Sequence, residues 1–179
     1  MRVIAGKLGG RRLQSPPSSV TRPTSDRVRE ALFATLGPID GLSVLDLFAG
    51  SGALAIEALS RGASHAVLVE RDRVAAKVIA QNLEALGLAE PVARLVRGSA
   101  KRALAQAARA AESYDLLFLD PPYRQAAALG GDTVKLIEPI LAPSARVVTE
   151  SDRRQPFELD LAMIDERRYG DTLIRIHQR

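Results

Sequence analysis

From about residue 43 onward, short apolar runs alternate with longer segments whose apolar residues recur every three or four positions. The runs have the length of buried strands, which we expect at 44–48, 66–70, 93–97, 115–119 and 145–150. The intervening segments have helical periodicity, and we expect helices near 51–61, 73–86, 100–111 and 133–141. In the second helix, the side chains expected to face inward are Val74, Val78, Ile79, Leu83 and Leu86. Four strand–helix pairs in a row predict an α/β fold, with a parallel sheet covered by helices on both faces.

The C-terminal part departs from this alternation. Residues 158–168 and 171–177 have the pattern of two strands joined by a short turn around Gly170. A tight turn between neighbouring strands predicts an antiparallel hairpin at the edge of the sheet.

The N-terminal part also differs from the repeating pattern. Apolar positions on either side of Gly9-Gly10 predict a short hairpin, and the Pro-Pro pair within 15–19 predicts a loop. A helix is expected over 26–36, with Thr24 or Ser25 as its N-cap. We therefore expect 1–40 to be an N-terminal extension of a main domain at 41–179.

Composition narrows the class of protein. The chain has 179 residues, enough for one folded domain, and no cysteine, which excludes disulfides and thiolate chemistry. His65 and His177 stand apart from any ligand-like cluster, so we expect no metal. No apolar run reaches about 18 residues, and the start lacks the apolar stretch of a secretory signal. We expect a cytoplasmic monomer that does not enter a membrane.

Basic residues are concentrated near the N-terminus. Residues 1–29 contain seven basic residues against the single Asp26, a net charge of +6, whereas the rest holds 18 basic and 20 acidic residues. Such an asymmetry is typical of a protein that binds a polyanion, although a solvated charged arm explains it equally well. The seven candidates for this contact are Arg2, Lys7, Arg11, Arg12, Arg22, Arg27 and Arg29.

The sequence DLFAGSG at 46–52 lies where the first expected strand turns into the first expected helix. Its two glycines let the backbone approach a ligand closely, and the helix N-terminus offers free N–H groups. The second expected strand ends at Glu70, whose carboxylate can accept hydrogen bonds from both hydroxyls of a ribose. The glycine spacing also fits a dinucleotide such as NAD. Asp46 favours a ligand with a positive charge, such as S-adenosylmethionine, over a pyrophosphate.

The sequence Asp120-Pro121-Pro122-Tyr123 follows the fourth expected strand. Ligands of an open parallel sheet bind beyond the C-terminal strand ends, so these residues are expected beside the DLFAGSG turn. A carboxylate and a carbonyl held by two prolines can accept hydrogen bonds from an exocyclic base amine, and Tyr123 can stack on the base. The pattern thus indicates methylation of a base amine, while an ordinary strand end with an Asp-Pro turn is the plainer alternative.

Six segments together resemble one family from end to end. They are RVIAGKLGGRRL (2–13), RPTSDRVREALFATL (22–36), DLFAGSGALAIEALSRGA (46–63), VLVERD (67–72), FLDPPY (118–123) and RYGDT (168–172). With these segments the chain resembles the class I methyltransferases. It is most similar to the bacterial RsmD family, which methylates the N2 amine of a guanine in 16S ribosomal RNA.

The resemblance implies a Rossmann-like class I methyltransferase fold, with a seven-stranded, mostly parallel sheet, one antiparallel strand, and an N-terminal β-hairpin and helix. It implies S-adenosylmethionine as donor, S-adenosylhomocysteine as product, and 16S rRNA in the small ribosomal subunit or an assembly intermediate as substrate. The residues expected at the cofactor are Asp46, Phe48, Gly50, Ser51, Gly52, Glu70, Arg71, Gly98, Ser99 and Ala100. Residues 120–123 would bind the target amine, and the hairpin with 22–29 would touch RNA.

One position departs from the family pattern. Relatives place an Asp after the third strand, where it contacts the adenine amine, whereas this chain has Ser99. A hydroxyl accepts that hydrogen bond more weakly than a carboxylate does.

Three alternatives stay open from the residues alone. A DNA amine methyltransferase fits DPPY, but the chain has no room for the target-recognition domain usual in such enzymes. A non-catalytic RNA-binding assembly factor fits the basic N-terminal part, and a nicotinamide oxidoreductase fits the glycine spacing.

The two glycines within 124–132 suggest either a mobile lid or an ordinary exposed loop.

Overall fold

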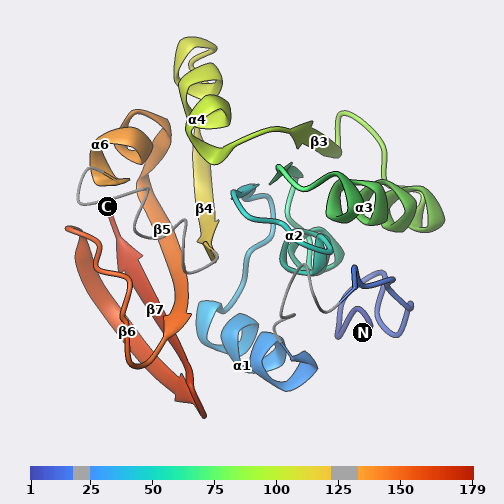
Figure 1. Cartoon of the computed structure of the whole chain (residues 1–179), viewed down its shortest axis with the longest axis horizontal. Coiled ribbons are helices and arrows are strands. Elements are labelled where there is room, and N and C mark those ends of the chain that lie inside the picture. The colour runs from blue at the N-terminus through green and yellow to red at the C-terminus, as the bar shows by residue number, and fades with distance from the viewer. Residues whose placement is uncertain (18–24, 122–132) are drawn as a thin grey trace.

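A computed structural model of the protein describes residues 1–17, 25–121 and 133–179. Its centre is a seven-stranded sheet with the strand order β3-β2-β1-β4-β5-β7-β6 (Figure 1). The strands are β1 (Ser43–Asp46), β2 (His65–Glu70), β3 (Ala93–Arg97), β4 (Tyr114–Leu119), β5 (Leu141–Asp152), β6 (Ala162–Tyr169) and β7 (Thr172–Gln178). Strands β3, β2, β1, β4 and β5 pair in parallel, and β7 is antiparallel to both of its neighbours, β5 and β6. The predicted Rossmann-like sheet with one antiparallel strand is confirmed.

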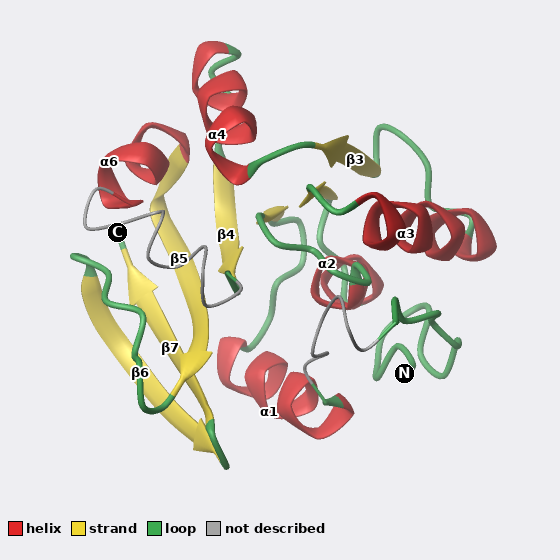
Figure 2. Cartoon of the chain, viewed as in Figure 1, coloured by secondary structure: helices red, strands yellow, loops and turns green. Residues whose placement is uncertain are grey.

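Helices cover both faces of the sheet, as Figure 2 shows. They are α1 (Asp26–Leu36), α2 (Ala53–Ser60), α3 (Arg73–Leu86), α4 (Ala100–Arg109) and α6 (Thr133–Ile137), with a 3₁₀ turn, η1, at Glu138–Ile140. Side chains from α1, α2 and α3 form one apolar cluster with the sheet, and side chains from α4, α6 and η1 form another on the opposite face. Within the described ranges, no helix has the length and apolar content needed to cross a membrane.

Four expectations about these elements need correction. The helix expected at 133–141 breaks into α6 and η1, because Pro139 lacks the N–H that an α-helix interior requires. Strand β5 begins directly after η1, at Leu141 rather than at 145. Strand β6 begins at 162 rather than at 158. Val74 does not face inward but is 49% exposed, because Ala75 and Ala76 take the inward positions in the first turn of α3.

The N-terminal segment, which we define as residues 1–17, shares the main core. Its predicted hairpin is a minimal one, consisting of a single antiparallel bridge between Arg2 and Arg12. Val3 and Leu13 are buried in the same apolar cluster as α1, α2 and α3. In Figure 1 this segment lies beside α1 and α2. The segment is therefore packed onto the sheet's helical layer along its length.

Candidate functional site

The turn between β1 and α2, residues 46–52, is built around two glycines with left-handed backbone. Gly50 has φ of 55° and Gly52 has φ of 81°. A Cβ added to Gly52 would lie only 3.0 Å from Cδ2 of Leu68 and 3.3 Å from Cδ1 of Ile56. Both the backbone angle and the close packing therefore require glycine at position 52. We call residues 46–52 the glycine turn.

Glu70 ties the glycine turn to the end of β2. One of its carboxylate oxygens accepts a hydrogen bond from the N–H of Gly50 at 2.9 Å, and the other accepts one from the N–H of Asp72 at 2.7 Å. The side chain is buried, with 9% of its surface exposed. Glu70 thus fixes two loops that meet at the C-terminal edge of the sheet.

Four carboxylates form a row along this edge, near or directly after the C-terminal ends of the neighbouring strands β2, β1, β4 and β5. They are Glu70, Asp46, Asp120 and Glu150. Side chains alternate between the faces of a strand, and the residue two positions before each carboxylate belongs to the apolar cluster of α1, α2 and α3. These preceding residues are Leu68, Val44, Phe118 and Val148. All four carboxylates therefore face the side of the sheet that carries α1 and α2.

The central carboxylates of the row hold their protons more tightly than usual. Burial raises the pKa of Asp46 to about 7; hydrogen bonds from the backbone of Phe48 and Ala55 oppose the rise, and the charge of Glu70 adds to it. Burial also raises the pKa of Asp120 well above its usual range, with further contributions from the charges of Glu150 and then Asp46. Each of these carboxylates would become ionised more readily beside a positive or hydrogen-donating ligand.

Glu150 is a site residue that the sequence analysis missed. The pairing of Leu119 with Thr149 places Asp120 beside Glu150 on the adjacent parallel strand. The sequence could have indicated Glu150 by its position at the C-terminal end of the fifth expected strand, because ligands of a parallel sheet bind at such ends.

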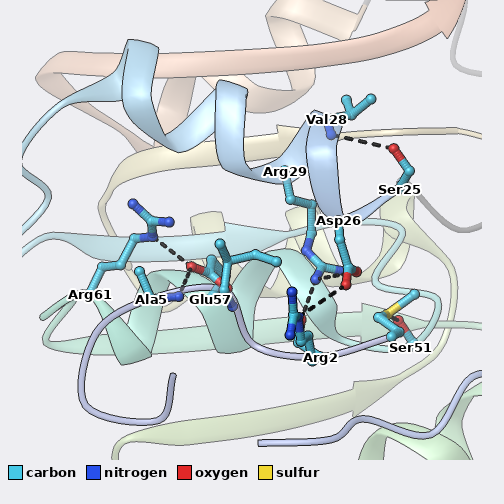
Figure 3. A network of polar contacts seen from close by, with 11 residues as sticks. Arg2, Ala5, Ser25, Asp26, Val28, Arg29, Ser51, Glu57 and Arg61 are labelled. Carbon is cyan, nitrogen blue, oxygen red and sulfur yellow. Dashed lines mark hydrogen bonds and ion pairs between the residues drawn. The ribbon is translucent and has the colours of Figure 1, made fainter. Parts of the chain in front are cut away.

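A second polar centre holds the N-terminal segment against α2 (Figure 3). The carboxylate of Glu57, which has no exposed surface, accepts hydrogen bonds from the N–H of Ile4 at 2.6 Å, the N–H of Ala5 at 3.0 Å and Nε of Arg61 at 2.6 Å. Next to it, the hydroxyl of Ser60 accepts from the N–H of Leu8 at 2.9 Å and donates to the carbonyl of Ala5. Apart from the Arg61 contact within α2 and its end, these hydrogen bonds join residues more than 50 positions apart in the chain.

Comparison with known proteins identifies the family. The family model described as "Conserved hypothetical protein 95" matches residues 1–178. The "Ribosomal RNA small subunit methyltransferase D" of Escherichia coli strain K12 is 38% identical over 185 residues, covering 100% of this chain and 90% of that protein. The chain belongs to this methyltransferase D family.

Other relatives of the methyltransferase D family agree in length and shape. YlbH of Bacillus subtilis strain 168 is 39% identical over 183 residues, covering 100% of this chain and 99% of the relative. The solved structure of protein yhhF from Escherichia coli superposes with a TM-score of 0.83 at 38% identity, covering 100% of this chain and 97% of that one. The family resemblance drawn from the six sequence segments is confirmed.

Three of the expected cofactor residues, Gly98 to Ala100, follow β3 and lie close to Glu70, which is hydrogen-bonded to the glycine turn. The N–H of Gly98 donates to the backbone carbonyl of Glu70 at 3.0 Å. The hydroxyl of Ser99 caps α4 by accepting from the N–H of Arg102 at 3.4 Å, and Ala100 is the first residue of that helix. Ser99 therefore has a structural role as the N-cap of α4. Its hydroxyl oxygen, a weaker acceptor than the carboxylate of an Asp, already accepts a hydrogen bond from the helix.

The basic residues of the N-terminal part divide into exposed and buried ones. Those on the surface are Arg2, Lys7, Arg11, Arg12 and Arg27. Arg29 was expected to contact RNA, but its side chain has no exposed surface and its guanidinium lies inside the protein (Figure 3). There Nη2 donates to the carbonyl of Arg2 and, at 3.0 Å, to the carboxylate of Asp26. Arg29 therefore holds the N-terminal segment to α1, and its side chain is not accessible to a ligand at the surface.

Several expected site residues lie outside the described residues. They are Arg22, Pro122 and Tyr123, together with the expected lid or loop at 124–132. Pro121 is described and is buried directly after Asp120. Among residues 1–17, 25–121 and 133–179, no group of three or more metal-ligating side chains has an arrangement that could hold a metal ion.

Proposed function

We propose that the protein transfers a methyl group from S-adenosylmethionine to the N2 amine of a guanine in 16S ribosomal RNA. The observation that carries the proposal is that Asp120 and the glycine turn lie at one edge of the sheet and that Asp120, Asp46 and Glu70 face the same side of it. A methyl donor and an acceptor amine bound there would be adjacent. The E. coli relative named as a small-subunit ribosomal RNA methyltransferase supports the choice of RNA.

The residues of the glycine turn suit the proposed cofactor. The Asp46 carboxylate, with its pKa of about 7, would ionise beside the positive charge of the methionine amino group. Glu70 uses one lone pair of each oxygen on the backbone N–H groups of Gly50 and Asp72, which leaves other lone pairs for two ribose hydroxyls. When bound, S-adenosylmethionine supplies a methyl group on a positively charged sulfur and leaves as S-adenosylhomocysteine.

Asp120 is the residue proposed to handle the target amine. The lone pair of an exocyclic amine is delocalised into the base, so the nitrogen must be drawn out of conjugation before it can react. A hydrogen bond from the amine to the Asp120 carboxylate favours that geometry, and the nitrogen must lose a proton as its new bond to carbon forms. A carboxylate whose pKa is raised is a competent acceptor for that proton.

The exposed basic residues of the N-terminal segment support a polyanionic substrate. Arg2, Lys7, Arg11 and Arg12 are all exposed, and Nη2 of Arg11 donates to the backbone carbonyl of Ala85 at 3.0 Å, which steadies that side chain. Lys and Arg side chains in such a group bind phosphates with a strong dependence on salt. We propose small ribosomal subunits, or an assembly intermediate, as the particle that presents the RNA.

The experiment that tests the proposal maps the methyl group. Purified protein, S-adenosylmethionine with a labelled methyl, and small subunits reconstituted from transcribed 16S RNA should yield one labelled guanine, methylated at N2. Asp120→Ala should lower the rate at least about a hundredfold while leaving the Kd for S-adenosylhomocysteine within threefold of wild type. Preferred labelling of duplex DNA would favour the DNA enzyme. Failure to bind S-adenosylhomocysteine would favour a non-catalytic RNA-binding factor.

A further inference from the structure

Asn82 is a polar residue within the apolar face of α3. The buried residues of this helix include Ala75, Val78, Ile79 and Leu83, and position 82 lies on the same face with 2% of its surface exposed. An amide buried in an apolar layer destabilises the fold unless its polar atoms are hydrogen-bonded. The identity of its partners therefore indicates what Asn82 does.

The partners of Asn82 come from two separate parts of the chain. Its Oδ1 accepts from the N–H of Gln14 at 2.8 Å, and its Nδ2 donates to the carbonyl of Gln14 at 3.0 Å. The same Nδ2 donates to the carbonyl of Ser51 at 2.9 Å. One side chain thus joins Gln14 of the N-terminal segment to Ser51, between the two glycines of the glycine turn.

A second contact links the same two parts. The hydroxyl of Ser51, labelled in Figure 3, lies 3.4 Å from the sulfur of Met1. The N-terminal segment therefore contacts the side chain of Ser51 directly and its carbonyl through Asn82. The glycine turn has little freedom to absorb a shift, because Glu70 holds Gly50 and the space beside Gly52 is filled. A displacement of the segment is therefore transmitted to the turn.

We propose that Asn82 is a positioning residue that couples the N-terminal segment to the glycine turn, so that RNA bound to the segment and cofactor bound to the turn strengthen each other's binding. This inference rests on the proposed function, which assigns the two ligands to these two parts.

The chemistry of the amide explains why position 82 suits this role. Asn82 supplies an acceptor for one N–H and donors for two carbonyls at the same time. Alanine would supply neither, and a carboxylate would repel the two carbonyls. By thermodynamic linkage, RNA and cofactor must change each other's affinity by the same factor, which typically lies between about fivefold and a hundredfold.

The test measures this factor with full-length protein. The Kd of S-adenosylhomocysteine is determined by equilibrium dialysis, with and without saturating small subunits reconstituted from transcribed 16S RNA. In wild type we expect the subunits to lower this Kd about tenfold. In Asn82→Ala we expect the ratio to fall below about twofold.

Ser60→Ala is the matched control. It removes two hydrogen bonds of the N-terminal segment but none to the glycine turn, and Glu57 still holds residues 4 and 5. We expect it to keep the wild-type ratio within twofold. An unchanged ratio in Asn82→Ala, or an equal loss in Ser60→Ala, would overturn the role of Asn82.

A measurement on wild type keeps the proposal testable if Asn82→Ala does not fold. S-adenosylhomocysteine should slow hydrogen exchange of the Gln14 amide, which is bonded to Asn82, at least threefold more than that of the Lys7 amide, which is bonded to Ser60. Equal effects on the two amides would contradict the coupling. A wild type that binds no S-adenosylhomocysteine would refute the proposed function, whereas independent binding of both ligands would refute this inference alone.

Discussion

Glu57 and Asp46 are both almost fully buried carboxylates, yet their surroundings are opposite. Glu57 accepts hydrogen bonds from two backbone N–H groups and from Arg61. Asp46 accepts hydrogen bonds from backbone groups but has Glu70 beside it and Asp120 on the next strand. Within the described residues, the charge of Glu57 is balanced by the protein itself, whereas that of Asp46 is opposed by its neighbours.

The difference separates a structural charge from one kept for a ligand. A buried charge with its own cation stabilises the segments that it joins, while a buried charge among other acids costs stability until a positive group arrives. Removing the two charges should therefore change the free energy of unfolding in opposite directions.

The largest effect is expected at Glu57. Glu57→Ala leaves two partly buried N–H groups and the Arg61 guanidinium without their acceptor, so we expect the free energy of unfolding to fall by about 3–5 kcal/mol. Urea unfolding followed by circular dichroism measures this change. The control Glu84→Ala, on the exposed face of α3, should stay within about 0.5 kcal/mol of wild type. A loss below about 1 kcal/mol in Glu57→Ala would show that Glu57 is not an anchor.

Two glycines of the N-terminal segment offer a matched pair. Gly6 has φ of 80°, and an added Cβ would lie 1.9 Å from the carbonyl oxygen of Ser60. Gly10 has φ of 81° with no atom within 4 Å of such a Cβ. We expect Gly6→Ala to lower the free energy of unfolding by about 2–4 kcal/mol and Gly10→Ala by about 1 kcal/mol. Equal losses in thermal or urea unfolding would mean that the segment does not dock closely on α2.

The opposite sign is expected at Asp46. Its raised pKa means that protonation of Asp46 favours the fold, so the contribution of Asp46 to stability is fully present below about pH 4 and is lost as the pH rises toward 7. Asp46→Asn removes this loss, and we expect it to raise the free energy of unfolding by about 1–3 kcal/mol at pH 8 and by almost nothing at pH 4. Urea unfolding at both pH values checks the sign. Destabilisation at pH 8 would place Asp46 with Glu57 as a structural charge.

The last effect, similar in size to that of Asp46→Asn, concerns ligand binding at the same carboxylate. If a positive group binds beside Asp46, binding requires the ionised form, so the affinity for S-adenosylhomocysteine should rise about tenfold per pH unit from pH 5 to 7 and then level off. Isothermal titration across this range measures the slope. In Asp46→Asn the affinity should be weaker and nearly independent of pH. A wild-type affinity that is flat over this range would remove Asp46 from the proposed contact with the amino group.

The parallel part of the fold could be predicted because its signals are local. Each strand near 44–48, 66–70 and 115–119 is an apolar run followed by a helical pattern, and each appears in the structure within a few residues of its expected bounds. The break between α6 and η1 was also readable in principle from Pro139. This part of the fold could be predicted from the sequence because interactions between neighbouring residues determine these strands and helices.

The residues that were missed depend on distant partners. Glu57 lies inside the apolar stretch of α2, and its partners Ile4 and Ala5 are more than 50 positions away. Arg29 was expected on the surface because, although its partner Asp26 lies on the same helix, its hydrogen bond to the carbonyl of Arg2 forms only when the N-terminal segment packs against α1. Glu150 becomes a neighbour of Asp120 only when β4 and β5 pair. Such contacts follow from the tertiary fold and leave no local pattern.

The order of strands at the far edge sets a constraint on synthesis. Strand β6 precedes β7 in the chain but lies outside it in the sheet, and β7 pairs with both β5 and β6. During translation, β6 therefore cannot join the sheet until β7 has been synthesised, and until then the outer edge of β5 is unpaired. Exposed strand edges are the parts of a nascent chain most prone to pair with the wrong partner. A deletion that removes residues 172–178 should consequently release β6 as well and leave a chain that aggregates as it is made.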